Sequence, residues 1–146
     1  MILIAHRGNI SGKDPARENE PGYVKDALQK GYNVEVDVWR QNNVFFLGHS
    51  CPQYPIDEKF LENNRLWCHA KNLSALDHMS KNKYVHCFWA EHDHFPLTSR
   101  AIIWTEPGKD VSPNSIFVLP ELSGITDKTK LPPCLGVCSD HIAAFV

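Results

Sequence analysis

The chain has 146 residues, of which 42% are hydrophobic and 22% are charged, a composition that can fill the core of one globular domain. Its formal net charge of -2, with both signs interspersed, argues against a nucleic-acid-binding protein, which would carry a basic stripe. No apolar run approaches the roughly 18 residues of a membrane span, and the short apolar N-terminus lacks the basic region of a signal peptide. We therefore expect one domain over residues 1–146, with no integral membrane segment.

Short apolar runs rich in β-branched and aromatic residues predict the strands. In chain order they are Ile2–His6, Val34–Val38, Val44–Gly48, Leu66–Ala70, Tyr84–Ala90, Ala101–Thr105, Ser115–Leu119 and Leu135–Ser139. Asparagines in the turn at 41–43 tolerate positive φ, so the second and third runs are expected to form a hairpin.

Helix signals lie between the early strands, at Glu18–Gly31, Pro55–Asn64 and Asn72–Lys83. The first has a proline near its start and a glycine at its end, and the last spaces Leu73, Leu76 and Met79 as one helical face. After Tyr84 the connections are rich in Pro, Gly, Ser and Asp and are expected to be loops. Alternation of strand and helix predicts an α/β fold with a parallel sheet.

The five cysteines, Cys51, Cys68, Cys87, Cys134 and Cys138, indicate free thiols. Their number is odd and no secretion signal is visible, so we expect a reducing compartment, the cytoplasm. Three residues separate the last two cysteines, which is not the CxxC spacing of a zinc knuckle.

Two carboxylates share one face of the second predicted strand. In "VEVDV" strand alternation places Glu35 and Asp37 on one side and the three valines on the other. Paired carboxylates repel each other unless a cation lies between them, and oxygen ligands suit Mg²⁺ or Ca²⁺. The alternative is an antiparallel strand with its polar side in water.

Other titratable residues follow neighbouring strands. In a parallel array the C-terminal strand ends meet on one rim, so we expect a convergent group there. Histidines can exchange protons near neutral pH and basic side chains can bind an anion, which together suit metal-assisted phosphate-ester chemistry. The expected group is His6, Arg7, Glu35, Asp37, His49, His69 and Lys71.

Several motifs occur in the order found in one enzyme family. They are "HRG" at His6–Gly8, "ENE" at Glu18–Glu20, "GYNVEVDV" at Gly31–Val38, and "LGHS" at Leu47–Ser50; "GVCSD" near the end adds a final match. The first half of the chain thus resembles the glycerophosphodiester phosphodiesterases, within the phospholipase-C-like phosphodiesterase barrels. The resemblance implies a shortened or incomplete TIM-type (β/α) barrel of parallel strands, with several helices replaced by loops. It also implies metal-dependent hydrolysis of a small phosphodiester.

The resemblance further implies roles for these residues. His6 and His49 become the acid/base pair, and Glu35 with Asp37 binds the metal. Arg7 holds the phosphate, and Lys71 contacts either the phosphate or the charge that develops during the reaction.

Two positions depart from the family pattern. His69 stands where the family has a third metal carboxylate, so a softer metal than Mg²⁺ or Ca²⁺ is an alternative. Ser50 replaces the aspartate that follows the second histidine in the family.

Trp104 lies at the end of one later strand and Glu91 directly follows another, and both are expected to contact the substrate. An open parallel edge favours pairing with a second copy, so a homodimer is expected. Two other functions fit the same residues. One is a non-catalytic phosphate- or metabolite-binding protein on the same scaffold, and the other is a related phospholipase or lyase that acts on a lipid head group.

Overall fold

The computed structural model describes all 146 residues. Its strands are β1 (Ile2–His6), β2 (Asn33–Gln41), β3 (Val44–Leu47), β4 (Tyr54–Ile56), β5 (Leu66–Ala70), β6 (Cys87–Phe88), β7 (Ile103–Thr105), β8 (Ser115–Val118) and β9 (Gly136–Ser139). The α-helices are α1 (Pro21–Gln29), α2 (Glu58–Leu61) and α3 (Leu73–Ser80). Short 3₁₀ turns follow at η1 (Pro120–Ser123), η2 (Lys128–Lys130) and η3 (Ile142–Phe145).

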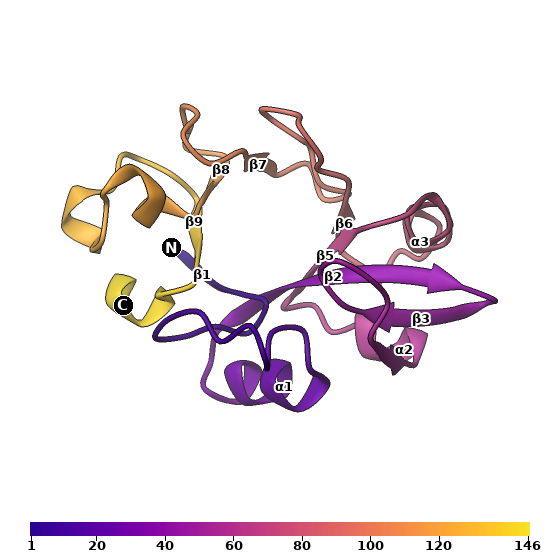
Figure 1. Cartoon of the computed structure of the whole chain (residues 1–146). Helices are drawn as coiled ribbons and strands as arrows, with labels where there is room; N and C mark the ends of the chain where they lie inside the picture. Colours follow the sequence, from indigo (N-terminus) through magenta and orange to yellow (C-terminus); the bar gives the residue numbers. More distant parts are fainter.

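The nine strands form one mixed sheet. Strands β7, β8, β9, β1, β2, β5 and β6 pair side by side in parallel, in that order. Strand β2 continues beyond its parallel neighbours and pairs antiparallel with β3, which in turn pairs antiparallel with β4. Figure 1 shows the parallel strands curving into an arc, with α1, α2 and α3 outside it.

The local sequence explains the first helix and the hairpin. Glu20 caps α1, because its carboxylate accepts hydrogen bonds from the backbone N–H groups of Gly22 and Tyr23, and Pro21 occupies the first turn. Asn42 and Asn43 both adopt positive φ, at 52° and 63°, as a tight two-residue hairpin turn requires. The predicted hairpin is therefore confirmed.

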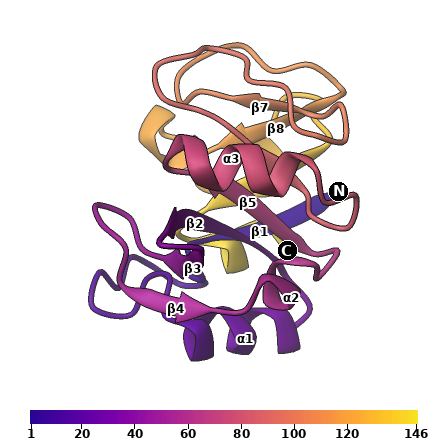
Figure 2. The same ribbon diagram turned by 90° about the vertical axis from the view of Figure 1, so that its right-hand side faces the viewer.

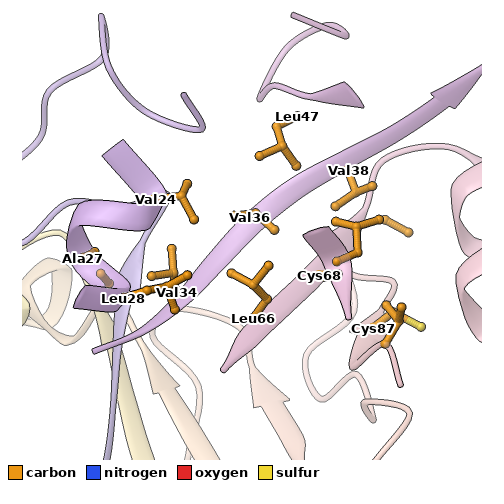
Figure 3. Packing of buried hydrophobic residues seen from close by; sticks show 14 of the residues in the cluster. Val24, Ala27, Leu28, Val34, Val36, Val38, Leu47, Leu66, Cys68 and Cys87 are labelled. Carbon is orange, nitrogen blue, oxygen red and sulfur yellow. The ribbon is translucent and has the colours of Figure 1, made fainter. Parts of the chain in front are cut away.

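The outer face of the sheet packs against the helices. Val34, Val36 and Val38 of β2 are fully buried, and Figure 3 shows them following one another along this strand. Val24 and Ala27 of α1 belong to the same cluster and lie at the Val34 end of this row. The valine face of "VEVDV" is thus a packed core face, which leaves its carboxylates on the inner side of the arc.

The inner face of the arc has a second, smaller core. It consists of aromatic and aliphatic side chains from six strands: Ile4, Trp67, Phe88, Trp104, Ile116, Val118 and Cys138. Because side chains alternate along a strand, residues two positions further along three of these strands also point inward, namely His6, His69 and Asp140. The apolar cluster therefore forms a floor beneath polar groups at the C-terminal strand ends.

The prediction of a TIM-type barrel is wrong. The sheet is an open half-barrel, because β6 pairs only with β5 and β7 pairs only with β8. It also contains the antiparallel strands β3 and β4, and the chain has only three α-helices. A TIM-type barrel needs eight parallel strands, each followed by a helix.

An extended segment bridges the opening between β6 and β7. The N–H of Ser99 donates to the carbonyl of Cys87 in β6 at 2.8 Å, and the N–H of Trp104 in β7 donates to the carbonyl of Pro96 at 2.8 Å. Buried His86 is 2.7 Å from the hydroxyl of Thr98 and holds the same segment. In Figure 2 the long connections around β7 lie at one end of the molecule, away from α1 and α2.

Candidate metal and phosphate site

A strained turn at the end of β1 presents His6 and Arg7. Arg7 has a positive φ of 55° and its N–H donates to the carbonyl of Glu35 at 2.9 Å. Gly8 follows with φ 92°, and a Cβ there would lie 2.7 Å from the ring of Tyr23. Only glycine tolerates both conditions without strain, so "HRG" is a local structural requirement for placing the two preceding side chains.

Asp37 is buried and firmly held. The side chain of Asn19 accepts from the N–H of Asp37 at 2.9 Å and donates to its Oδ2 at 3.0 Å. Nε of Arg7 lies 3.0 Å from the same oxygen, although it is not aligned for a hydrogen bond. Burial alone would raise the pKa of Asp37, but the nearby His49 and His69 rings and the Arg7 guanidinium hold it well below its usual range.

Glu35, Asp37 and His69 form a group that could hold a metal ion. One ligand atom from each residue lies within 4.8 Å of the other two. Nδ1 of His69 is 3.6 Å from Oε1 of Glu35 and 3.4 Å from Oδ1 of Asp37. Burial would lower the pKa of His69, but the two carboxylates outweigh it and raise the pKa to about 9. In the absence of another cation, the imidazolium therefore balances part of the negative charge.

His6 is oriented by a carboxylate from the far end of the chain. Its Nδ1 donates to Oδ1 of Asp140 at 2.7 Å, and its Nε2 is 3.7 Å from Oε2 of Glu35. Burial would lower the pKa of His6, but the hydrogen bond to Asp140 and the charge of Glu35 outweigh it and raise the pKa.

Asp140 is itself supported on two sides. Nδ2 of Asn9 donates to its carboxylate at 2.8 Å, and its N–H donates to Glu121 at 3.0 Å. Sequence reasoning gave no role to Asp140 or Asn9, although "GVCSD" was matched as a motif. The signal available was the last residue of that motif, a carboxylate at a strand end.

His49 lies on a loop after β3 and is about half exposed, at 51% of its side chain. Its Nδ1 is 3.6 Å from Oδ2 of Asp37. The indole N–H of Trp39 fixes the loop by donating to the carbonyl of Gly48 at 2.7 Å. Gly48 adopts φ 158°, and a Cβ there would overlap the carbonyl oxygen of Cys51. The "LGHS" glycine is therefore required for the turn that presents His49.

One pocket is lined by nearly all the residues that were predicted from the sequence to form the site. Its cavity has a volume of about 160 Å³. Val118 lies in its lining, and Glu106 and Asp93 add acidic groups. The predicted residues that line it are His6, Arg7, Glu35, His49, His69, Lys71, Glu91 and Trp104.

Asp37 does not line the cavity itself, but its carboxylate lies 3.4 Å from the ring of His69, which does. Lys71 makes no ion pair or side-chain hydrogen bond with the rest of the protein, so its ammonium group remains available to a ligand. His92 and His94, on the same loop as Glu91, do not line the cavity.

Comparison with known proteins assigns no family to the chain. No family model, no curated protein and no solved structure matches it. None of its helices is long and apolar enough to span a membrane.

Proposed function

We propose that the protein is a metal-dependent phosphodiesterase that acts on a small diester of the glycerophosphodiester type. The observation that carries the proposal is one cavity lined by two histidines, an arginine and a lysine beside a metal-capable group of side chains. Metal-assisted phosphoryl chemistry needs positive charge for the phosphate oxygens and groups that move protons. The motif order of the first half of the chain supports the same conclusion.

Arg7 and Lys71 would bind the phosphate. Both line the cavity, and Lys71 has no competing protein partner. Arg7 is anchored by Asp37 and by Glu18, whose carboxylate lies 3.5 Å from Nη1. The guanidinium is thus fixed in place, whereas the lysine can follow the charge that develops on the phosphate.

His6 and His49 would transfer the protons. Because Asp140 accepts from Nδ1 of His6, Nε2 of that ring is the nitrogen that faces the other polar groups. A hydroxyl adjacent to the phosphate would attack phosphorus and lose its proton to one histidine. The bond to the leaving oxygen would break as the other histidine protonates it, and water would then open the cyclic phosphate.

Glu35, Asp37 and His69 would hold the divalent cation. Bound there, the cation would neutralise charge on the phosphate and increase the acidity of the attacking hydroxyl. Mg²⁺ and Ca²⁺ are the ions that the carboxylates alone would favour.

The test uses a panel of phosphodiesters with and without a hydroxyl next to the phosphate. We expect cleavage of the first kind, abolished by chelator, and a loss of about 10²–10⁴-fold in kcat for His6→Gln and for His49→Gln. His78→Gln is the matched control, since His78 pairs with Glu58 on the surface at 2.8 Å. Cleavage that is indifferent to both site histidines would refute the proposed mechanism.

The exposure of His49 supports a second candidate, a protein that binds phosphate esters without cleaving them. This histidine is half exposed and no aspartate follows it, because position 50 is serine. Calorimetry would then detect binding of a phosphodiester with no turnover. Loss of that binding in Lys71→Gln would locate it in the cavity.

A further inference from the structure

The orientation of His69 determines which of its ring nitrogens can bind a cation. Its Nε2 lies 2.7 Å from the carbonyl oxygen of Ala90. A carbonyl oxygen can only accept, so Nε2 carries the proton and the neutral ring has its free lone pair on Nδ1. That atom faces the carboxylates of Glu35 and Asp37. The ring of Phe88 stacks on His69, with centroids 5.0 Å apart and planes inclined by 14°.

Each of the two carboxylates has an oxygen that is free to bind a cation. Oδ2 of Asp37 is occupied by Asn19 and Arg7, whereas Oδ1 is the oxygen nearer to His69. Glu35 is only 2% exposed, yet its Oε2 has no hydrogen-bond partner. An unpartnered buried carboxylate oxygen is costly, and a bound cation would remove that cost.

We propose that His69 makes this site selective for a late first-row divalent ion, represented by Zn²⁺, over Mg²⁺ and Ca²⁺. The inference rests on the metal site of the proposed function and names its ion. Mg²⁺ and Ca²⁺ prefer sites made of oxygen ligands. An imidazole nitrogen suits Zn²⁺ and its neighbours, and affinity for such donors rises along the series from Mn²⁺.

The surroundings of His69 are those of a metal ligand. A ligating histidine generally donates its other ring N–H to a carbonyl or carboxylate, which fixes the tautomer, and the carbonyl of Ala90 does so here. Three protein ligands leave a position for water or substrate, as in catalytic zinc sites. His69 therefore acts as the residue that determines metal specificity.

The experiment measures metal binding without substrate. Metal-free protein would be titrated with Zn²⁺, Mn²⁺, Mg²⁺ and Ca²⁺ by calorimetry. We expect one Zn²⁺ per chain, bound at least about tenfold more tightly than Mg²⁺ or Ca²⁺. The double variant His92→Gln/His94→Gln, on the neighbouring exposed loop, is the control for adventitious binding and should keep this site unchanged.

Two variants test the role of the ring. His69→Glu replaces the nitrogen by oxygen and should reverse the ranking, so that Mg²⁺ or Ca²⁺ binds at least as tightly as Zn²⁺. Phe88→Leu keeps all three ligands but removes the stacked ring, and should weaken Zn²⁺ binding by about tenfold. If His69→Glu does not fold, the order of metal affinities in the wild type and the Zn²⁺ affinity of Phe88→Leu still test the inference.

Equal affinity for Zn²⁺ and Mg²⁺, no binding of any ion, or loss of Zn²⁺ in the loop control would each overturn the inference. Retained diester cleavage without Zn²⁺ preference would overturn only the inference. Selective Zn²⁺ binding without turnover of any diester would overturn only the proposed phosphodiesterase function.

Discussion

Asp140→Asn tests whether the buried contact between His6 and Asp140 is an ion pair in the folded protein. The carboxylate oxygen accepts from His6 at 2.7 Å and from Asn9 at 2.8 Å. An asparagine oxygen can accept both bonds, so the substitution removes the charge and keeps most of the geometry. Hydrogen bonds to charged groups contribute about 1.5–3 kcal/mol and neutral ones about 0.5–1.5, so the free energy of unfolding should fall by about 1–2 kcal/mol.

The loss should depend on pH in a defined direction. The pKa of His6 is raised, so its contribution is complete below the unfolded value of 6.5 and is lost as pH rises through the folded pKa. The pKa of Asp140 is lowered, so its contribution is complete above the unfolded value of 3.8 and is lost as pH falls through the folded pKa. Between pH 3.8 and pH 6.5 both contributions are present. The difference in the free energy of unfolding between wild type and variant should therefore be largest in this range.

Urea unfolding in the presence of chelator measures this difference, at about pH 5 and again at about pH 9, where the His6 contribution declines. The control is Asp77→Asn, whose exposed carboxylate pairs only with Lys81 at 3.2 Å and should matter little at either pH. An equal loss at both pH values would show that His6 is not charged against Asp140, and no loss at either would refute the pair altogether.

Three further substitutions test residues that position the site and one residue of the inner hydrophobic core beneath the pocket. Gly48→Ala must displace the loop that carries His49, so kcat should fall while the melting temperature changes by only a few degrees; unchanged kcat would contradict this. Asn19→Ala leaves the backbone N–H of Asp37 without a partner and should cost about 1–3 kcal/mol in urea unfolding. Ile116→Ala removes a fully buried side chain beneath the pocket and should cost about 2–5 kcal/mol; a loss under 1 kcal/mol would mean that the inner core is loosely packed.

The regular strands were predictable because their signals are local. Ile2–His6 and Leu66–Ala70 form with the predicted bounds, since each is a short, mainly apolar run that is followed by a basic residue, Arg7 or Lys71. The predicted strand Tyr84–Ala90 is reduced to Cys87–Phe88, because its free edge meets the bridging segment at Ser99 instead of another strand. β4 was missed, since Tyr54–Ile56 is short and contains a proline.

The closure of the sheet was not predictable from such signals. Whether two edge strands meet depends on the curvature of the whole sheet and on the connection between them. Here β2 runs on to Gln41 and pairs with β3, and the strands β6 and β7 that would have to meet have only two and three residues. The number of strands in the sequence suggested a barrel. The sheet stays open because β6 and β7 are short and β2 extends into an antiparallel pairing with β3.

The candidate site was partly visible because its residues occur in pairs along single strands. The alternation of side chains along a strand predicted that Glu35 and Asp37 share one face. The convergence of the C-terminal ends of parallel strands predicted that His6 lies near them. Asp140 was not predicted as a partner of His6, because the two residues are 134 positions apart and the motif that ends in Asp140 does not indicate which side chain its carboxylate contacts.

The central position of β1 has a consequence for how the protein folds. One edge of this strand pairs with β2, about thirty residues later, but the other pairs with Gly136–Ser139 of β9. During synthesis β1 therefore has an open edge until Gly136–Ser139 have left the ribosome, and an open edge is prone to wrong pairing. Contacts of such long sequence separation also slow folding. The side of the cavity formed by Trp104 and Val118 is connected to β1 only through β8 and β9, so a chain that still lacks β9 has neither that connection nor the His6–Asp140 contact.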